Sequence, residues 1–261
     1  YEIAGTLSLG DEHEYIRWGS IMPRRAMLPE NHPCRDCNVS KDALCCALEI
    51  EPLSDFRNQG GHVSLAAGEP LFHQGDLADC VFSLTSGVIK LNSVLPDGRR
   101  QVIAFLFPGD FVGLEAGERH DFSAEVVSDA MLCRFLRGRF ERFASHYPAL
   151  ADARYRRAAC ELAMAHQRIV MLGRKTAAER LASFLSDIHR RTGMNEADGV
   201  ILVPLPMSRM DIADYLGLTK ETVSREFTRL RTSRIIRPRS LTLLEILDPQ
   251  RMHDLACGIA A

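Results

Sequence analysis

The chain has 261 residues, of which 46% are hydrophobic and 25% charged, and its net charge is −2. This length suits two domains, each with a sizeable core, and the composition is that of a globular protein. Its apolar runs are strand-sized, well short of the roughly 18 residues of a membrane helix, so we expect no membrane partner. The N-terminus is acidic where an export signal needs an apolar core, which predicts a cytoplasmic protein.

Eight cysteines in a chain without an export signal argue against a disulfide framework and favour metal binding or redox chemistry. A polar extension, residues 1–33, is expected to be extended or poorly ordered. Cys34, Cys37 and a third cysteine (Cys45 or the adjacent Cys46) then lie close together in a loop-like stretch, and Cys133 follows far downstream. Such thiolates suit a soft metal centre. A structural zinc site remains an alternative, although zinc sites usually use two close pairs of ligands.

Residues from about 52 to 135 contain short β-like runs separated by glycine-containing turns. The runs at 81–85, 88–91 and 101–107 have strand-like lengths, and Pro-Asp-Gly at 96–98 is typical of a hairpin turn. Regular short strands with such turns predict an all-β sandwich or barrel-like roll.

The periodicity then changes to that of a helix. From Ala151 to Leu172, side chains at alternating steps of four and three residues form a heptad seam, and Gly173 is a plausible stop. We expect this seam to be a dimer contact, and its central members are Ala158, Leu162, Ala165, Ile169 and Leu172. The alternative is one amphipathic helix packed on its own domain. A second amphipathic helix is expected from about residue 175 to 191.

A helix-turn-helix pattern follows. Ser208 is expected to cap a first helix with Asp211 as its capping-box partner, Gly217 to make the turn, and Thr219 to cap a second helix. The apolar residues at helical spacing predict the buried faces of the two helices: Ile212, Ala213, Leu216, Val223, Phe227 and Leu230. Two short strands after residue 235 suggest a wing.

The outer face of the second helix carries the residues that we expect to contact DNA: Lys220, Glu221, Ser224, Arg225 and Arg229. Glutamate can accept from cytosine N4, and arginine can donate two hydrogen bonds to guanine, so Glu221 and Arg225 suit base recognition. Lys220 and Arg229 suit phosphates. The alternative for Glu221 and Arg225 is an exposed ion pair one turn apart. Residues 173–240 contain 13 Lys/Arg against 8 Asp/Glu, a net +5, which supports a DNA-binding role for this part.

This order of elements resembles the CRP/FNR superfamily of bacterial regulators. The motifs at 109–113, 178–182 and 211–225 are similar to its FNR/FixK branch. The resemblance implies an α+β fold, with an N-terminal cyclic-nucleotide-binding-like β-roll as sensor, a dimerisation helix and a C-terminal winged helix-turn-helix. The corresponding segments, after the 1–33 extension, are 34–146, 147–173 and 174–261. It also implies that the protein is a transcription regulator and not an enzyme. Such a regulator binds a TTGAT-type palindrome in double-stranded DNA as a homodimer and contacts RNA polymerase.

The resemblance also bears on the cysteines. FNR proteins hold a [4Fe–4S] cluster with three N-terminal cysteines and one in the β-roll, which implies the ligand set Cys34, Cys37, Cys45 and Cys133, with Cys46 as the alternative third ligand. Oxygen would destroy the cluster and release the DNA. An iron–sulfur electron carrier is a further alternative, but a carrier needs no sequence-specific DNA reader.

Cyclic-nucleotide sensors of the same superfamily have a glutamate after a Gly-x-x-Gly stretch and an arginine directly before a serine. At the matching places this chain has Leu114, and Phe122 before Ser123. The arginine that would clamp a phosphate is therefore missing. We expect no cyclic nucleotide to bind.

Overall fold

The computed structural model of the protein describes Cys34, Cys37, Val39 and residues 43–114, 117–192 and 200–259. The extension 1–33 lies outside the described residues. The helices are the 3-10 helix η2 (Leu44–Ala47), α1 (Ile50–Asn58), α2 (Arg137–His146), α3 (Pro148–Arg174), α4 (Ala177–Thr192), α5 (Arg209–Leu216), α6 (Lys220–Thr232) and α7 (Pro249–Cys257). The strands are β1 (Gly60–Leu65), β2 (Pro70–Phe72), β3 (Cys80–Val94), β4 (Arg100–Leu106), β5 (Phe111–Val112), β6 (Ser123–Leu136), β7 (Ile201–Pro204), β8 (Ile236–Pro238) and β9 (Leu243–Ile246).

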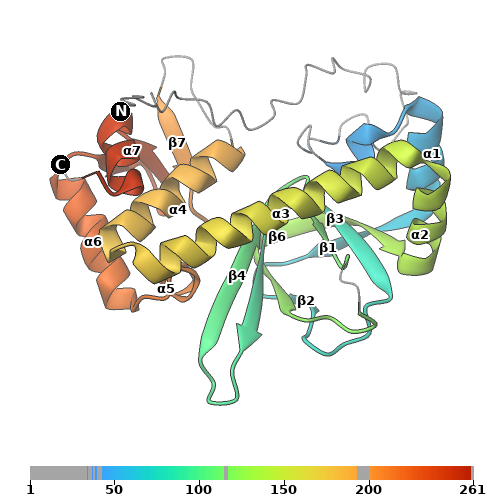
Figure 1. Cartoon of the computed structure of the whole chain (residues 1–261), viewed down its shortest axis with the longest axis horizontal. Coiled ribbons are helices and arrows are strands. Elements are labelled where there is room, and N and C mark those ends of the chain that lie inside the picture. Colours follow the sequence, from blue (N-terminus) through green and yellow to red (C-terminus); the bar gives the residue numbers. More distant parts are fainter. Residues whose placement is uncertain are drawn as a thin grey trace, which may run out of the picture.

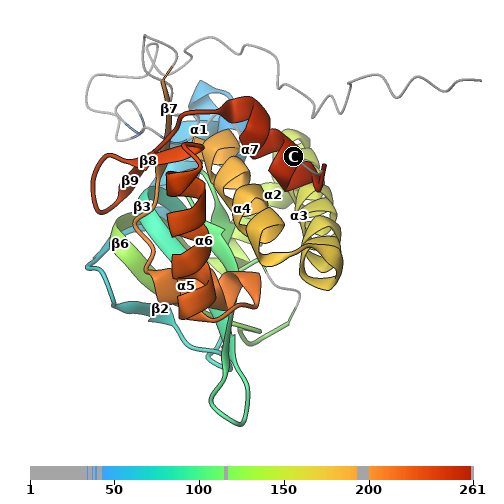
Figure 2. The same cartoon turned by 90° about the vertical axis from the view of Figure 1, so that its left-hand side faces the viewer.

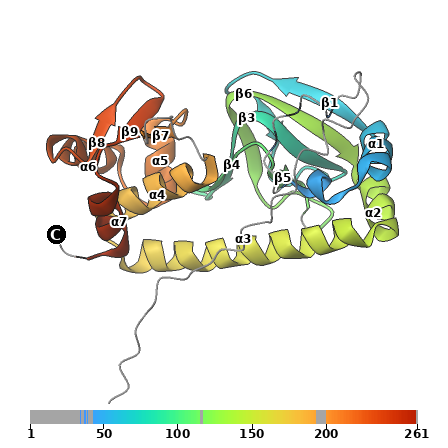
Figure 3. The ribbon, with the colours of Figure 1, turned by 90° about the horizontal axis from the view of Figure 1, so that it is seen from above.

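The predicted α+β architecture is confirmed. An antiparallel roll with the strand order β1-β6-β3-β4 forms the N-terminal part, with β2 added to β6 and β5 to β3. The long helix α3 runs along both this roll and the C-terminal part, which contains α4 to α7 and the small sheet β7-β9-β8 (Figures 1 and 3). The predicted hairpin at 96–98 joins β3 to β4. Within the described residues, no helix is both long and apolar enough to cross a membrane.

The start of the β region was predicted wrongly, because residues 50–58 form helix α1 and the strands begin only at Gly60. Leu53 and Phe56 are three residues apart, so they lie on one helix face. Phe56 is buried and stacks on Phe135 of β6 with ring centroids 4.2 Å apart. This long-range aromatic contact stabilises a helix that local glycine and strand signals did not indicate.

A second difference concerns Gly87, which was expected to separate two strands. Instead β3 runs without interruption from Cys80 to Val94, and its pairing with β6 shifts register around this glycine. Gly87 has φ 84°, and a Cβ atom there would lie 2.3 Å from the carbonyl oxygen of Asp129. Glycine is therefore required for a bulge within the strand, and it does not end the strand.

The roll and the C-terminal part do not have fully separate cores, as a simple two-domain arrangement would have. Four side chains of β3, β4 and the loop after β4 join the core around α4, α5 and α6: Val88, Val102, Phe105 and Phe107. Phe105 lies 5.3 Å, centroid to centroid, from Tyr215 of α5. The junction therefore buries apolar surface and contributes to stability.

Candidate functional site

The two helices of the predicted helix-turn-helix are capped as the sequence indicates. Ser208 Oγ accepts a hydrogen bond from the Asp211 amide at 3.1 Å, and the Asp211 carboxylate accepts one from the Ser208 amide at 3.2 Å, which completes the capping box. Gly217 ends α5 in the left-handed conformation (φ 62°). Thr219 Oγ1 accepts from the Thr222 amide at the start of α6. These local bonds fix where each helix begins and ends.

Helix α6 has the two faces that were predicted. The six predicted inner residues of α5 and α6 are buried: Ile212, Ala213, Leu216, Val223, Phe227 and Leu230. The five predicted DNA-contacting residues are exposed: Lys220, Glu221, Ser224, Arg225 and Arg229. In Figure 2, α6 lies across the near side of the molecule with β8 and β9 next to it. This is an accessible helix face with a wing beside it, as insertion into a major groove requires.

Glu221 and Arg225 do not form an ion pair with each other, which was the alternative to base recognition; both lie within the described residues 200–259. Arg225 Nε instead lies 3.9 Å from Glu226, and Arg229 Nη1 lies 3.8 Å from the same carboxylate. Glu226 is buried, so its carboxylate lies at the base of the exposed face. The side chains of Glu221 and Arg225 are therefore not tied to each other.

Sequence reasoning missed a carboxylate that organises the wing. Glu245 of β9 is 5% exposed and accepts two hydrogen bonds of 2.9 Å from the guanidinium of Arg237. Arg239 Nε lies 2.5 Å from the same carboxylate. A glutamate between Leu244 and Ile246 in a strand was the available signal. Its effect is to hold two wing arginines in fixed positions, where they can meet a phosphate backbone.

The predicted seam of α3 faces solvent. Ala158, Leu162, Ala165 and Ile169 are exposed, with 58% of Leu162 and 68% of Ile169 accessible. Leu172 is half-buried against the C-terminal core. The helix packs on its own chain through other residues, namely Leu150, Ala153 and Met171. The exposed stripe is therefore not explained by packing within one chain, which was the alternative to a dimer contact.

The cysteines of the predicted ligand set come together. Cys34, Cys37, Cys45 and Cys133 all line one cavity whose apolar lining is Val39, Leu53, Phe56 and Phe135. Cys133 lies on β6, opposite His62 of β1 on one side and Ser83 of β3 on the other, so its backbone is held in the sheet. Cys45 is supplied by η2. Cys46, the alternative third ligand, is not among the described residues that line the cavity.

The thiols of this cavity affect one another electrostatically. A hydrogen bond with Cys46 raises the pKa of Cys45 well above its usual value, and burial and the neighbouring Cys34 and Cys37 raise it further. Burial raises the pKa of Cys133, the charge of Arg57 opposes that increase, and Cys37 adds to it. At neutral pH the Cys45 and Cys133 thiols therefore hold their protons until a metal displaces them.

Within the described residues, no group of three or more His, Cys, Asp or Glu side chains is placed to hold one metal ion. A zinc ion needs its thiolates at about 2.3 Å from a single point. A cubane cluster spreads its four thiolate ligands over separate iron atoms, and four cysteines around an apolar cavity are a donor set of that kind.

Comparison with known proteins assigns the family. Residues 62–147 match the cyclic nucleotide-binding domain family, and residues 179–255 match the Crp-like helix-turn-helix domain family. The nitrogen fixation regulation protein FixK of Bradyrhizobium diazoefficiens is 39% identical over 235 residues, which cover 88% of this chain and 96% of that protein. The chain belongs to the CRP/FNR family of transcription regulators.

Other CRP/FNR proteins agree in sequence and in structure. The transcriptional activator protein FnrL of Cereibacter sphaeroides is 34% identical, and the match covers 78% of this chain and 84% of that protein. The solved structure of FixK2 from Bradyrhizobium japonicum is 36% identical, covers 77% of this chain and 98% of that one, and superposes with a TM-score of 0.70. This regulator is thus a DNA-binding protein and not an enzyme.

As the sequence indicates, the roll of this CRP/FNR regulator lacks the arginine with which cyclic-nucleotide sensors clamp a phosphate. Leu114 and Phe122 occupy the positions compared above, and the nearby Arg119 donates from Nη1 to the Gly75 carbonyl at 2.6 Å. Its guanidinium is thus already engaged by the backbone.

The junction between the β-roll and the helix-turn-helix is ionic as well as apolar. Lys90 Nζ of β3 lies 2.8 Å from the Asp211 carboxylate of α5 and 2.8 Å from Glu125 of β6. Arg100 of β4 lies 2.9 Å from Asp211 and 2.8 Å from Asp214. Burial would raise the pKa of Asp211, but bonds from Lys90 and Ser208 and the charge of Arg100 outweigh it and lower the pKa. Figure 3 shows β4 at this junction.

Proposed function

We propose that this regulator is an oxygen- or redox-responsive transcription activator that binds a [4Fe–4S] cluster and controls anaerobic or microaerobic genes. The observation that carries the proposal is the convergence of Cys34, Cys37, Cys45 and Cys133, from two distant parts of the chain, on one apolar cavity. The relative FnrL, named a transcriptional activator protein, supports activation as the outcome. A regulator with structural zinc, or with no metal and another signal, is the alternative.

The residues of the cavity have different proposed roles: the cysteines bind the cluster and the apolar residues shield it. Cys133 is a fixed ligand on the sheet, whereas the other three cysteines belong to the segment before α1. A bound cluster supplies a group that oxygen attacks and that joins this segment to the roll. The apolar lining by Val39, Leu53 and Phe56 limits access of water to the thiolates. Loss of the four bonds between cysteine sulfur and the cluster would release the segment before α1 from Cys133.

The DNA side of the proposal uses the exposed faces described above. Two chains joined along the α3 stripe would present two α6 helices, which in such dimers enter successive major grooves roughly 34–36 Å apart. In this arrangement Glu221, Ser224 and Arg225 read each TTGAT half-site, while Lys220 and Arg229 contact phosphates. The exposed hairpin around Asp97 is the proposed contact with RNA polymerase.

The deciding experiment is the content of iron, acid-labile sulfide and zinc per chain in full-length protein purified without oxygen. About four irons and four sulfides are expected. One zinc per chain without sulfide would mean that the cysteines form a structural zinc site and not a sensor. The absence of both iron and zinc would mean that the regulator responds to another signal. Binding to a TTGAT palindrome and to a scrambled duplex, compared on the same sample, tests the DNA reader separately; an electron carrier would show no preference.

The protein with its cluster is expected to sediment as a dimer, and the air-exposed protein as a monomer. The reason is that the α3 stripe offers a modest apolar contact, so a small change near the cysteines suffices to shift the association equilibrium. Sedimentation velocity of both forms at one concentration measures this. Identical masses would contradict a switch that acts through dimerisation, and leave the cluster assignment intact.

Arg225→Ala is expected to weaken binding to the palindrome by about 1–3 kcal/mol per half-site contact and to relax specificity at the matching base pair, without changing metal content. Titration of both duplexes at fixed salt measures the loss. Arg231→Ala is the matched control, because Arg231 is also exposed on α6 but lies about 120° around the helix from Arg225. Full specificity in Arg225→Ala would refute the assigned base contact.

A further inference from the structure

The cysteine cavity contains a charged residue that the ligand assignment does not use. Arg57, in the last turn of α1, is 8% exposed and lines the cavity together with the four cysteines. The other lining residues that the structure describes are apolar or carry hydroxyl groups, so Arg57 is the single cation among them. Arginine is rarely buried unless it is paired.

The usual partner for such an arginine is a carboxylate. In the part of the chain that the structure describes, no aspartate or glutamate forms an ion pair with Arg57. The acidic side chains closest along α1, Glu51 and Asp55, are exposed. A buried cation without a carboxylate costs free energy unless another anion compensates it. Among the described lining residues, the groups that can supply negative charge are the four cysteines, which become thiolates when they bind a metal.

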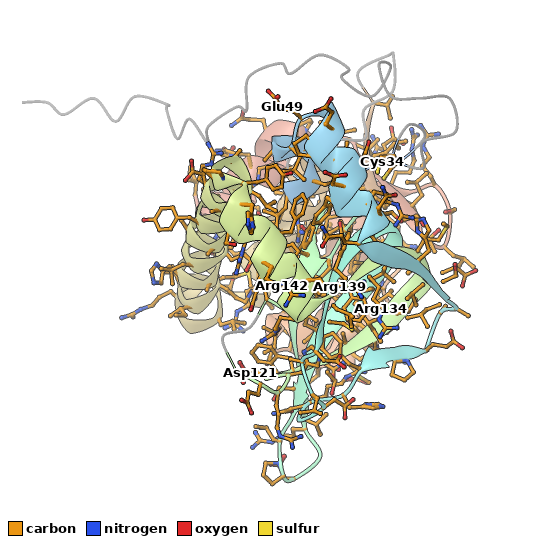
Figure 4. All side chains as sticks on the ribbon, turned by 90° about the vertical axis from the view of Figure 1, so that its right-hand side faces the viewer. Cys34, Glu49, Asp121, Arg134, Arg139 and Arg142 are labelled. Carbon is orange, nitrogen blue, oxygen red and sulfur yellow. The ribbon has the colours of Figure 1, made fainter. Side chains whose placement is uncertain are left out.

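We propose that Arg57 is a charge-compensating residue for the metal centre of this cavity. The inference rests on the proposed function. Four cysteine thiolates around an iron–sulfur core leave the assembly with a net negative charge, and an apolar cavity makes that charge costly. The guanidinium of Arg57 offsets it from within the same lining. Figure 4 shows Cys34 beside α1, the helix that carries Arg57.

This charge has a direction of effect. Reduction adds one electron to an already negative assembly, and a nearby cation favours the more negative state. Net charge and hydrogen bonds to sulfur are among the factors that set the potential of such clusters. Arg57 therefore raises the reduction potential of the bound cluster and slows its loss.

A purely structural role is the competing explanation, because a cation in the last turn of a helix interacts favourably with the helix dipole. That role predicts a small loss of stability when the charge is removed and no change at the cluster. The two explanations therefore differ in their effect on the reduction potential of the cluster, which an interaction with the helix end does not change.

The test compares Arg57→Met, which removes the charge but keeps an unbranched side chain, with Arg57→Lys, which retains the charge. In anaerobic full-length protein, Arg57→Met is expected to shift the reduction potential of the cluster to more negative values and to accelerate loss of visible absorbance to an iron chelator several-fold. Arg57→Lys should stay near the wild type in both. Arg139→Met is the control for an exposed arginine, since Arg139 lies on α2 away from Cys34 (Figure 4).

The outcomes separate the two proposals. Wild-type protein that assembles no cluster would overturn the proposed function and this inference together. A wild-type cluster whose potential and chelator lability are the same in Arg57→Met would overturn the inference alone, and a lower unfolding midpoint in that variant would then assign Arg57 to the helix end.

Discussion

Lys90→Met is expected to lower the free energy of unfolding by about 3 kcal/mol, the lower end of the cost of removing one partner from a buried ion pair. Lys90 is 5% exposed, and its ammonium lies 2.8 Å from the Asp211 carboxylate, which is itself buried. Methionine fills the space of the stem but leaves this carboxylate with less compensation. Arg100, 2.9 Å from Asp211, remains and limits the loss. Urea unfolding followed by circular dichroism measures the change.

A double-mutant cycle identifies the interaction. Asp211→Asn removes the charge and retains an oxygen that can accept the capping bond from Ser208. Combined with Lys90→Met, it should recover part of the stability, because no buried charge then lacks its partner. Additive losses in the double variant would mean that Lys90 contributes through packing or through its pair with Glu125, and not through its pair with Asp211.

Acid unfolding offers an independent check of the same pair. The folded pKa of Asp211 is lowered below its unfolded value of about 4. Its contribution is therefore complete above that unfolded pKa and disappears as the pH falls through the lower folded pKa. In Lys90→Met the lowering is smaller, so stability should decline less steeply below about pH 4 than in the wild type. Equal slopes would contradict a role for Lys90 in setting this pKa.

The Lys90–Asp211 pair also connects the β-roll with the helix-turn-helix. Asp211 completes the capping box of α5 and at the same time accepts Lys90 and Arg100 from the roll. A movement of β3 or β4 therefore acts directly on the first helix of the helix-turn-helix, in addition to any movement of α3. The apolar contact of Phe105 with Tyr215 lies at the same junction.

How far the sequence predicted the structure depended on the range of the interactions. The helix-turn-helix was predicted to the residue because its caps at Ser208, Gly217 and Thr219 are local, each decided within three or four positions. Helix α1 was missed because Phe56 is stabilised by Phe135, far along the chain. Gly87 was misinterpreted because the oxygen that excludes a side chain there belongs to a different strand.

The candidate site shows the same limit. Spacing alone indicated a thiolate group before α1, and only the family resemblance connected it with Cys133. The charges that surround the functional residues were not predicted at all, since Arg57, Glu245 and the Lys90–Asp211 pair acquire their roles from elements that meet in the folded chain. No local pattern distinguishes these residues from ordinary surface charges.

Cys133→Ser is expected to abolish retention of the cluster. Serine preserves the size of the side chain, but its hydroxyl is a hard donor that replaces a soft thiolate poorly. In the proposed ligand set, Cys133 is also the member that would tie the N-terminal cysteines to the sheet, because β1 and β3 hold its strand on both sides. Substitution of Cys34 or Cys37 would remove one ligand from a segment that still supplies two others. Substitution of Cys133 would remove the proposed ligand that attaches the cluster to the roll.

The expected result is loss of nearly all iron and sulfide in Cys133→Ser purified without oxygen, with far-ultraviolet circular dichroism and the urea midpoint close to those of the wild type. Cys160→Ser is the matched control, because Cys160 is exposed on α3 and does not line the cavity. Full iron and sulfide in Cys133→Ser would refute the ligand assignment. Retention of one zinc in the wild type and its loss in Cys133→Ser would instead place a structural zinc site on the same four cysteines, since both centres need Cys133 while only one contains sulfide.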